Sequence, residues 1–260
     1  MYSVLRKYIR KLILDIISLT SVPRPGIHIL NGHFLSLDDD TQAKLFHDQL
    51  KFLLSYGVNF VNFDIAVKRI RERKIIDDKC MVAFTFDDGF EECFTKIRPV
   101  LNKFGIKAGF FINPNFIDGD EDYQQKFKTN IVKTNKSPMS WEQILILKEE
   151  GHIIGAHTMD HTNLNTQHLS FLEYQIGGSK EYIENKLNSE CEYFAFPFGK
   201  LKHISNKGIE IARKHFKYIF SQSNYKSYFS FNGSVINRRH FECDWPYKHV
   251  LYFLKEKTFV

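Results

Sequence analysis

The sequence predicts one α/β domain with a parallel sheet, and two observations support this prediction. From Gly26 onward, short apolar stretches typical of strands alternate with segments of helical periodicity. The segment Cys80–Phe86 is an almost continuous apolar run, which is typical of a strand buried on both faces of a parallel sheet. The chain has 260 residues. Barrels of alternating strands and helices with about 250 residues often form one domain.

Helices are expected where apolar residues recur at helical spacing and a glycine or a cap marks an end. Gly57, Gly105 and Gly151 follow three such segments, and Ser140–Gln143 has the pattern of a capping box. The expected strands are Gly26–Leu30, Val58–Phe63, Cys80–Phe86, Ala108–Asn113, Ile153–Ala156, Tyr193–Phe196 and Tyr218–Ser221. The expected helices are Ala43–Tyr56, Ile65–Arg73, Ile97–Phe104, Ser140 to Gly151, Leu169–Leu187 and Asn206–His215. The polar stretch Asp118–Pro138 is predicted to be a long loop.

Composition excludes several classes of protein. Hydrophobic residues make up 43% and charged residues 25% of the chain, so it is neither disordered nor collagen-like nor a disulfide-stapled miniprotein. The 25 phenylalanines are an unusual aromatic volume, most of which we expect in the core. A net charge of +6 indicates a solvated mixed surface or attraction to an anionic partner such as phospholipid. No zinc-finger spacing or long basic run occurs, so we expect no nucleic-acid partner.

The four cysteines are widely spaced and form no C-x-x-C pair. This pattern favours buried reduced thiols and a reducing compartment, with two disulfide bridges as the alternative. We therefore expect a cytoplasmic or membrane-peripheral protein, with an exported form as the alternative.

Residues 1–25 are predicted to be a basic amphipathic segment that precedes the main domain at residues 26–260. Leu5, Leu12 and Ile16 belong to a set of apolar residues at helical spacing. The basic residues mostly between them are Arg6, Lys7, Arg10 and Lys11. The apolar run is too short for a membrane span and has no obvious cleavage site. Two interpretations remain: the helix packs on the domain, or residues 1–20 make peripheral contact with an anionic membrane surface.

The strongest chemical signal is the sequence Thr-Phe-Asp-Asp-Gly at residues 85–89. Asp87 and Asp88 come directly after a buried strand, and Gly89 permits a turn that brings both carboxylates toward one cavity. Adjacent like charges raise the pKa of one carboxyl group. A metal ion would hold one carboxylate ionised and leave the other as a base. The alternative is a solvated Asp-Asp-Gly turn.

The second signal is His-Thr-Met-Asp-His at residues 157–161, which follows the expected strand Ile153–Ala156. Active sites of α/β barrels lie at the carboxyl ends of strands. His157 and His161, four residues apart, can share a metal ion, and Asp88 would be the third protein ligand. Three protein ligands leave a position open for water and substrate, as in catalytic zinc sites. Alone, the two histidines would be interpreted as surface residues.

The third signal is Tyr-Phe-Ala-Phe-Pro-Phe-Gly at residues 193–199, a strand that runs into a Pro-Gly turn. Together, Thr-Phe-Asp-Asp-Gly, His-Thr-x-x-His and Phe-x-x-Pro-Phe-Gly, in this order, resemble the polysaccharide deacetylase family, which is carbohydrate esterase family four. The resemblance covers roughly residues 81–221. It implies a distorted (β/α) barrel, usually with seven strands, and metal-dependent hydrolysis of the N-acetyl group of an amino sugar.

The resemblance also implies roles for residues. Asp87 matches the general base, while the metal ligands match Asp88, His157 and His161. Thr158 matches the hydroxyl residue that supports the histidine loop. Phe198 occupies the position whose backbone N–H helps to hold the oxyanion, and Pro197 precedes it on the same turn. Apart from the resemblance, the aromatic residues Trp141 and Trp245 are expected to face the sugar.

The sequence departs from the family at two places. Many members have arginine where Ala195 stands, to orient the base, and we expect Arg238 or Arg239 to supply that guanidinium. The late Leu-x-His motif that carries the general acid is absent in its usual form. His240 and His249 are the candidates, and we favour His240 because it neighbours the arginines.

The sequence therefore predicts an amino-sugar N-deacetylase that acts on a polysaccharide, cell-wall polymer or surface glycolipid. The expected cofactor is one divalent metal, zinc first, with cobalt, nickel or manganese as alternatives. The expected partner is a carbohydrate, with a lipid-linked form as one option. The alternatives are a deformylase or other metal-dependent amidohydrolase, and an inactive sugar-binding module.

Overall fold

The apolar run that predicts a central strand forms one. In the computed structural model, which describes residues 2–38, 40–75 and 78–259, this run is β3 (Cys80–Phe86), and all of its residues are buried. Strand β1 (Gly26–Gly32) pairs with it in parallel along its full length and is also buried throughout. Strands without a polar face need cover on both sides. A packed barrel interior and an outer layer of helices provide that cover.

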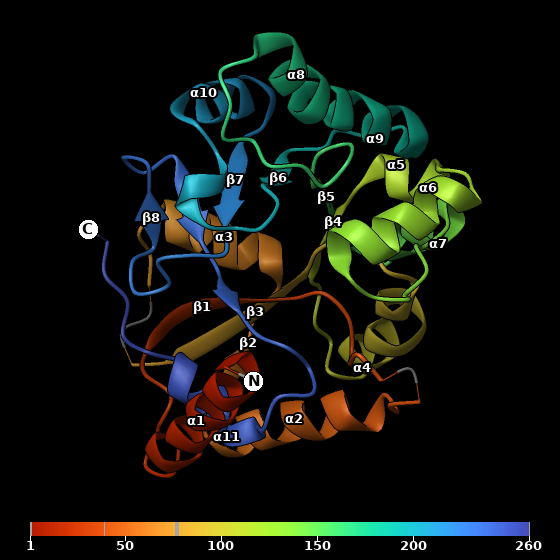
Figure 1. Cartoon of the computed structure of the whole chain (residues 1–260). Helices are drawn as coiled ribbons and strands as arrows, with labels where there is room; N and C mark the ends of the chain where they lie inside the picture. The colour runs from red at the N-terminus through yellow and green to blue at the C-terminus, as the bar shows by residue number, and fades with distance from the viewer. Residues whose placement is uncertain (1, 39, 76–77, 260) are drawn as a thin grey trace.

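The strands form one curled sheet. Its order is β10-β1-β3-β4-β5-β6-β7-β9-β8, with β2 beside β3 (Figure 1). The remaining strands are β2 (Asn59–Phe60), β4 (Gly109–Ile112), β5 (Ile153–Ala156), β6 (Tyr193–Ala195), β7 (Tyr218–Ser221), β8 (Phe229–Ser230), β9 (Val235–Asn237) and β10 (Arg239–His240). Only Arg238 separates β9, which pairs in parallel with β7, from β10, which pairs in parallel with β1. With β9 and β10 taken as one split strand, the parallel members form the predicted distorted barrel.

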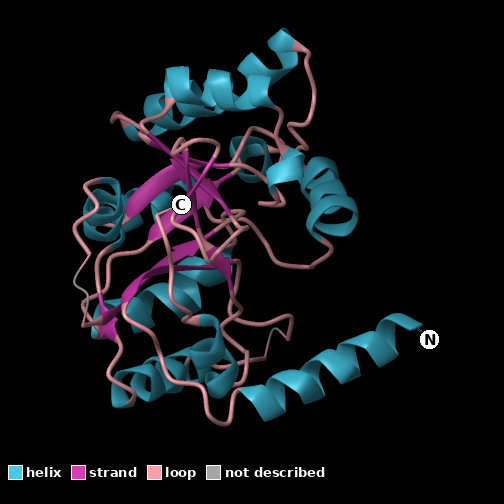
Figure 2. Ribbon diagram, turned by 90° about the vertical axis from the view of Figure 1, so that its left-hand side faces the viewer, coloured by secondary structure: helices cyan, strands magenta, loops and turns pink. Residues whose placement is uncertain are grey.

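Helices surround the strands (Figure 2). The longer ones are α1 (Tyr2–Ile17), α2 (Lys44–Ser55), α3 (Phe63–Arg71), α7 (Trp141–Glu149), α9 (Ser179–Leu187), α10 (Asn206–His215) and α11 (Tyr247–Phe253). The shorter ones are η1 (Cys93–Ile97), α4 (Arg98–Lys103), α5 (Pro114–Asp118), α6 (Glu121–Lys126), η2 (Phe127–Val132), α8 (Leu169–Glu173), η3 (Tyr174–Gly178) and η4 (Leu201–His203). The capping box predicted at Ser140 is present, since its hydroxyl accepts from the Gln143 N–H and the Gln143 side chain accepts from the Ser140 N–H.

Two predicted elements were wrong in detail. The expected loop at Asp118–Pro138 contains α6 and η2, because Asp120 caps α6 by accepting from the Tyr123 N–H. The expected strand Val58–Phe63 is reduced to the two residues of β2, and Phe63 begins the next helix. The other expected strands and helices occur in the predicted order, while α5, β8, β9, β10 and α11 were not predicted.

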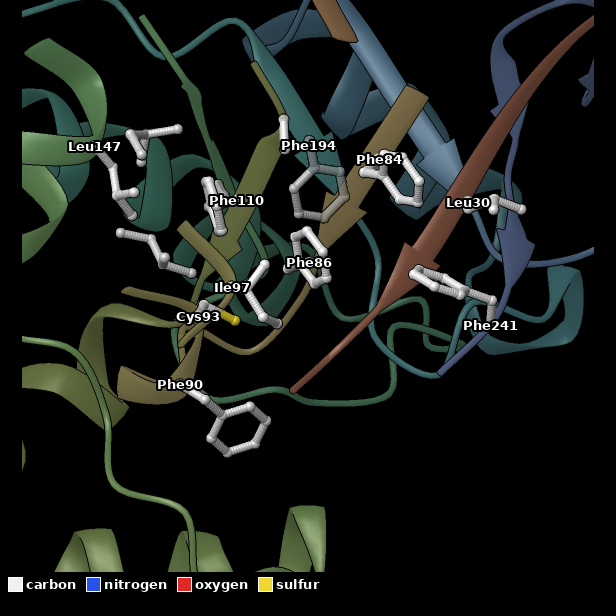
Figure 3. Packing of buried hydrophobic residues seen from close by; sticks show 14 of the residues in the cluster. Leu30, Phe84, Phe86, Phe90, Cys93, Ile97, Phe110, Leu147, Phe194 and Phe241 are labelled. Atoms are coloured by element: carbon white, nitrogen blue, oxygen red, sulfur yellow. The ribbon is translucent and has the colours of Figure 1, made fainter. Parts of the chain in front are cut away.

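Phenylalanines fill the barrel and its outer wall, as their number predicts. Phe86 stacks on Phe110 with ring centroids 5.6 Å apart, and Phe194 stacks on Phe216 at 4.9 Å. Figure 3 labels Phe84, Phe86, Phe110 and Phe194, which strands of the sheet contribute to one buried cluster. Such aromatic pairs add packing specificity to the burial of apolar area.

All four cysteines are buried and unbridged, as the reduced-thiol interpretation predicts. Burial raises the pKa of Cys80 and of Cys191 to about 12, so these thiols are inert packing residues. Within the described ranges, no helix is long and apolar enough to span a bilayer.

Candidate active site

The candidate site lies where several strands of the barrel end at the same edge. Asp87 and Asp88 follow β3, the histidine loop follows β5, and Phe198 follows β6. Arg238 reaches the same place from the break between β9 and β10. Because all these strands are parallel, their carboxyl ends converge, and residues from distant parts of the sequence meet there.

The backbone turns sharply at the two aspartates. Asp88 has φ +73° and Gly89 has φ +80°, so two successive residues adopt the left-handed conformation. Asparagine and aspartate tolerate this region better than most residues, and glycine adopts it freely. The turn leaves both carboxylates facing the site although neighbours along β3 alternate between its faces. Both aspartates are almost fully buried.

Asp88, His157 and His161 bring three ligand atoms together. Asp88 Oδ1 lies 3.4 Å from His157 Nε2 and 3.3 Å from His161 Nε2. Ligand atoms about 2.0–2.1 Å from a tetrahedral ion lie roughly 3.4 Å from one another. The spacing of these side chains therefore fits a divalent metal such as zinc, and they form one of two groups of ligand atoms found among the described residues.

The hydrogen bonding of these residues also supports metal binding. The Nδ1 atom of His157 lies 2.7 Å from the Ala195 carbonyl, so it carries the proton and leaves the Nε2 lone pair free. Asp88 Oδ1 and His161 Nδ1 are buried without a hydrogen-bond partner. A buried polar atom without a partner is costly, and a coordinated ion would compensate Asp88 Oδ1.

The histidine loop is held in an unusual backbone shape. Thr158 has φ +66° and His161 has φ +50°. Asp160, between the two histidines, fixes this loop by accepting hydrogen bonds from Asn115 at 2.7 Å, Tyr123 at 2.6 Å and Gln175 at 2.6 Å. The Thr158 hydroxyl accepts a hydrogen bond from the Thr162 N–H at 3.4 Å, within the same loop.

Asp87 is held by a two-pronged ion pair with Arg238. Arg238 Nη1 donates to Asp87 Oδ1 and Arg238 Nη2 donates to Asp87 Oδ2, each at 2.8 Å, and Asn31 Nδ2 donates to Asp87 Oδ2 at 3.0 Å. The guanidinium is 0% exposed. Burial alone would raise the pKa of Asp87, but the charge and the hydrogen bonds of Arg238 outweigh burial and hold the pKa below its ordinary value. Asp87 is therefore an ionised carboxylate near neutral pH.

Arg238, between β9 and β10, thus provides a guanidinium in place of the one that the sequence lacks at Ala195. Ala195 is buried in the barrel interior, and its carbonyl accepts the His157 proton. Of the two expected arginines, Arg238 occupies the site, whereas Arg239 stacks on the rings of Tyr225 and Phe253 at 4.3 and 3.7 Å.

A cavity of about 270 Å³ opens above these residues. Its polar lining includes both aspartates, both histidines and three residues absent from the sequence prediction, His33, Gln222 and Glu242. Its apolar lining consists of Phe34, Phe90, Ile131, Val132 and Phe198. Ile131 and Val132 come from η2, so the polar segment after α5 does contribute to the wall of the site.

His33 is the functional candidate that sequence reasoning missed. It follows β1 in the sequence Asn-Gly-His, and its Nδ1 lies 3.2 Å from Glu242 Oε1. Burial would lower the pKa of this ring, but the hydrogen bond and charge of Glu242 outweigh burial and raise the pKa to about 9. The available signal was a histidine three residues after the end of the first expected strand, but no chemically related residue lies next to it in the sequence.

Neither of the two histidines expected as general acids lines the cavity. His240 Nε2 shares the same Glu242 oxygen at 3.3 Å, and its Nδ1 pairs with the Gln222 side chain, but it does not line the cavity. Burial lowers the pKa of His240 to about 4, so its ring is neutral near pH 7. His249 instead lies 2.7 Å from Asp15 of α1.

Of the expected substrate-facing residues, only Phe198 lines the cavity. It has φ +60°, is half-exposed, and its ring centroid lies 4.8 Å from that of His161. Pro197 precedes it on the same turn but is not among the lining residues. Trp141 donates to Asp118 and packs beside Tyr182, away from the cavity. Trp245 packs against His240 and Phe253.

The turn after Phe198 requires glycine. Gly199 has φ +61°, and a Cβ there would overlap Gln222, whose backbone N would lie only 2.8 Å away. We expect Gly199→Ala to displace Gln222 and to reduce both thermal stability and activity. Gly57→Ala is the matched control, because Gly57 has φ +79° but nothing within 4 Å. It should cost only about 1 kcal/mol of unfolding free energy. Equal losses in the two variants, by thermal unfolding and kinetic assays, would contradict this expectation.

Comparisons with known proteins agree with this geometry. The family model described as polysaccharide deacetylase matches residues 74–216. The Bacillus subtilis protein YxkH is 25% identical over 184 residues, which cover 70% of this chain and 60% of that protein. The peptidoglycan-N-acetylglucosamine deacetylase of Bacillus cereus is 30% identical over 125 residues, 48% of this chain and 38% of that enzyme. The chain thus matches less than two thirds of the length of either relative.

Solved structures share the fold. IcaB from Ammonifex degensii superposes with a TM-score of 0.68 at 22% identity, covering 90% of this chain and 99% of that one. The Streptococcus pyogenes deacetylase PplD, solved with acetate, gives a TM-score of 0.67 at 19% identity, covering 91% and 100%. At these identities the likeness establishes the distorted (β/α) barrel.

Proposed function

The chain belongs to the polysaccharide deacetylase family, and on this premise we propose that it is a metal-dependent hydrolase that removes N-acetyl groups from an amino sugar. The sugar would belong to a polysaccharide, a cell-wall polymer or a surface glycolipid, free or lipid-linked. One observation carries the proposal: a three-ligand metal group and an ionised, arginine-paired carboxylate line the same cavity.

Asp88, His157 and His161 would hold the metal. When bound there, a divalent metal lowers the pKa of water and polarises a carbonyl group. The His₂Asp donor set suits zinc, with cobalt, nickel and manganese as alternatives. His157 is already the correct tautomer for ligation because Ala195 holds its Nδ1 proton.

Asp87 is proposed as the general base. Its carboxylate is ionised near neutral pH, and its Oδ2 lies 4.0 Å from His157 Nε2, which places it beside the ligand group. It would accept a proton from the attacking water, while Arg238 keeps the carboxylate in one orientation. Arg238 is therefore a positioning residue that acts through Asp87.

The leaving amine needs a proton, and His33 is the better-placed donor. His33 lines the cavity and its raised pKa keeps it protonated near neutral pH, whereas His240 is neutral and outside the cavity wall. Glu242 would orient His33 and stabilise its charged form. We therefore propose His33 as general acid in preference to His240.

Phe198 would complete the site. Its backbone N–H is proposed to stabilise the oxyanion, and its ring would form an apolar wall against the acetyl methyl group. Trp141 and Pro197 lie outside the cavity lining, so their expected contact with the sugar would have to occur beyond the acetyl-binding pocket.

The assignment of the acid predicts different effects of two substitutions. His33→Gln should lower kcat by about 10²-fold or more, the usual contribution of a general acid. In the parent enzyme, activity should fall on the alkaline side as His33 loses its proton, and this decline should be absent in His33→Gln. His240→Gln should retain most of the activity and the alkaline decline. pH–rate profiles of the three proteins test this, and a larger loss in His240→Gln would return the role to His240.

The function itself is tested by acetate release. We expect acetate from at least one member of a panel of polymeric, lipid-linked and nucleotide-linked N-acetyl sugars, loss of release after EDTA treatment, and recovery with zinc or cobalt. Release of formate from N-formyl sugars in place of acetate would favour the deformylase alternative. Sugar binding without hydrolysis, by metal-loaded protein, would favour the inactive binding module.

A further inference from the structure

The N-terminal helix α1 turns its apolar residues away from the barrel. In this helix Leu12 is 61% exposed, Ile13 51% and Ile16 59%, and Leu19 just beyond it is 64% exposed. Figure 2 shows α1 extending from the rest of the molecule. Packing on the domain, one of the two interpretations of this segment, would require the opposite orientation. These residues lie on consecutive turns of one helix and form an exposed apolar patch. Such patches mark sites that contact another protein or a membrane.

The opposite side of the helix contacts the barrel. Leu14 and Asp15 are half-buried and Ser18 is fully buried, so these residues form the contact side. Asp15 accepts from His249 Nε2 of α11 at 2.7 Å and pairs with Lys11 at 2.8 Å. The helix is therefore attached to the domain through this side, and the attachment leaves its apolar face outward.

The charge of the helix favours one kind of partner. Four basic residues, Arg6, Lys7, Arg10 and Lys11, belong to this helix. The only acidic residue of α1, Asp15, already has basic partners. A second copy of this helix would bring like charges together, whereas anionic lipid headgroups would be attracted to them.

We propose that α1 docks this protein onto an anionic membrane surface, with its apolar residues in the boundary between headgroups and acyl chains. Amphipathic helices with a cationic polar face bind such surfaces through buried apolar area and electrostatic attraction together. The barrel, attached to the opposite side of the helix, then lies in the aqueous phase above the membrane. The proposal depends on α1 and not on the metal site, so it stands or fails independently of the deacetylase activity.

The test is co-sedimentation of the full chain with vesicles. We expect binding to vesicles of phosphatidylcholine mixed with phosphatidylglycerol, weak binding to phosphatidylcholine alone, and weaker binding as salt is raised, because salt screens exposed charges. The double variant Leu12→Asp and Ile16→Asp should lower the partition coefficient by about tenfold or more. Leu145→Asp with Leu169→Asp is the matched control, since both leucines are exposed on other helices, and it should bind like the parent.

Three results would overturn the proposal. The first is absence of binding to anionic vesicles by the folded parent protein. The second is unchanged binding in the Leu12→Asp, Ile16→Asp variant. The third is a dimer, seen by light scattering and abolished by that variant, without vesicle binding, which would assign the apolar face to a second copy. Thermal unfolding and hydrolysis of a soluble substrate by each variant show that loss of binding does not reflect loss of the fold.

Discussion

Replacing Asp87 with asparagine is expected to reduce turnover by about 10²–10⁴-fold, the range for loss of a general base, while bound metal is retained. The reason is that Asp87 is bonded to Arg238 and Asn31 and contributes no ligand atom to the Asp88, His157 and His161 group. Metal content of the purified variant and kcat on an acetylated substrate are the two measurements.

His157→Ala provides the contrast. It removes a ligand atom, so both the metal content and the turnover should fall. Near-parental activity in Asp87→Asn would exclude Asp87 as the base. Loss of metal from Asp87→Asn would instead place this carboxylate among the ligands.

Replacing Arg238 with methionine is expected to have the largest effect on stability. Asp87 would remain as a buried charge without its ion partner, and breaking such a pair costs roughly 3–5 kcal/mol. The pKa of Asp87 should rise toward and beyond its ordinary value, because the charge that lowers it is gone. The base is active when ionised, so the acidic decline in activity should move to higher pH. Denaturant unfolding and a pH–rate profile measure the two effects.

The double variant Asp87→Asn with Arg238→Met separates fold from chemistry. It removes both charges, so much of the stability lost in either single variant should return, while activity stays low. Arg238→Lys should restore part of the stability but not the two-pronged contact. If Arg238→Met were as stable as the parent with an unchanged pH profile, the ion pair would have neither role.

The pattern of elements was sufficient to predict a parallel sheet and the residues that follow its strands, and the family resemblance implied that the sheet forms a barrel. The strongly apolar run of β3 and the alternation of elements identify the parallel sheet, and parallel strands place their carboxyl ends together. This is why the aspartate pair and the histidine pair, 70 residues apart, could be predicted to share one site. The turns needed by both motifs are local, so they leave a local signal in the sequence.

Contacts between the two ends of the chain left no such signal. His33 and Glu242 are separated by 209 positions, and they meet only because β10 pairs with β1 where the barrel closes. The choice of Arg238 over Arg239 depends on which of two adjacent residues faces inward. The outward orientation of α1 was equally hidden, because periodicity shows that a helix has an apolar face but not what that face contacts.

At the split strand that closes the barrel, activity can be lost without unfolding of the whole protein. Arg238 sits at the break between β9 and β10, and only two residue pairs, Leu30 with Arg239 and Asn31 with His240, join β10 to β1. Local opening of so short a seam requires far fewer contacts to break than global unfolding. Such an opening would withdraw the guanidinium from Asp87 and His240 from Glu242 while the metal ligands, carried by β3 and β5, stayed in place. Amide hydrogen exchange at residues 235–240 would then report on the working state of the catalytic base more directly than the melting temperature of the whole protein.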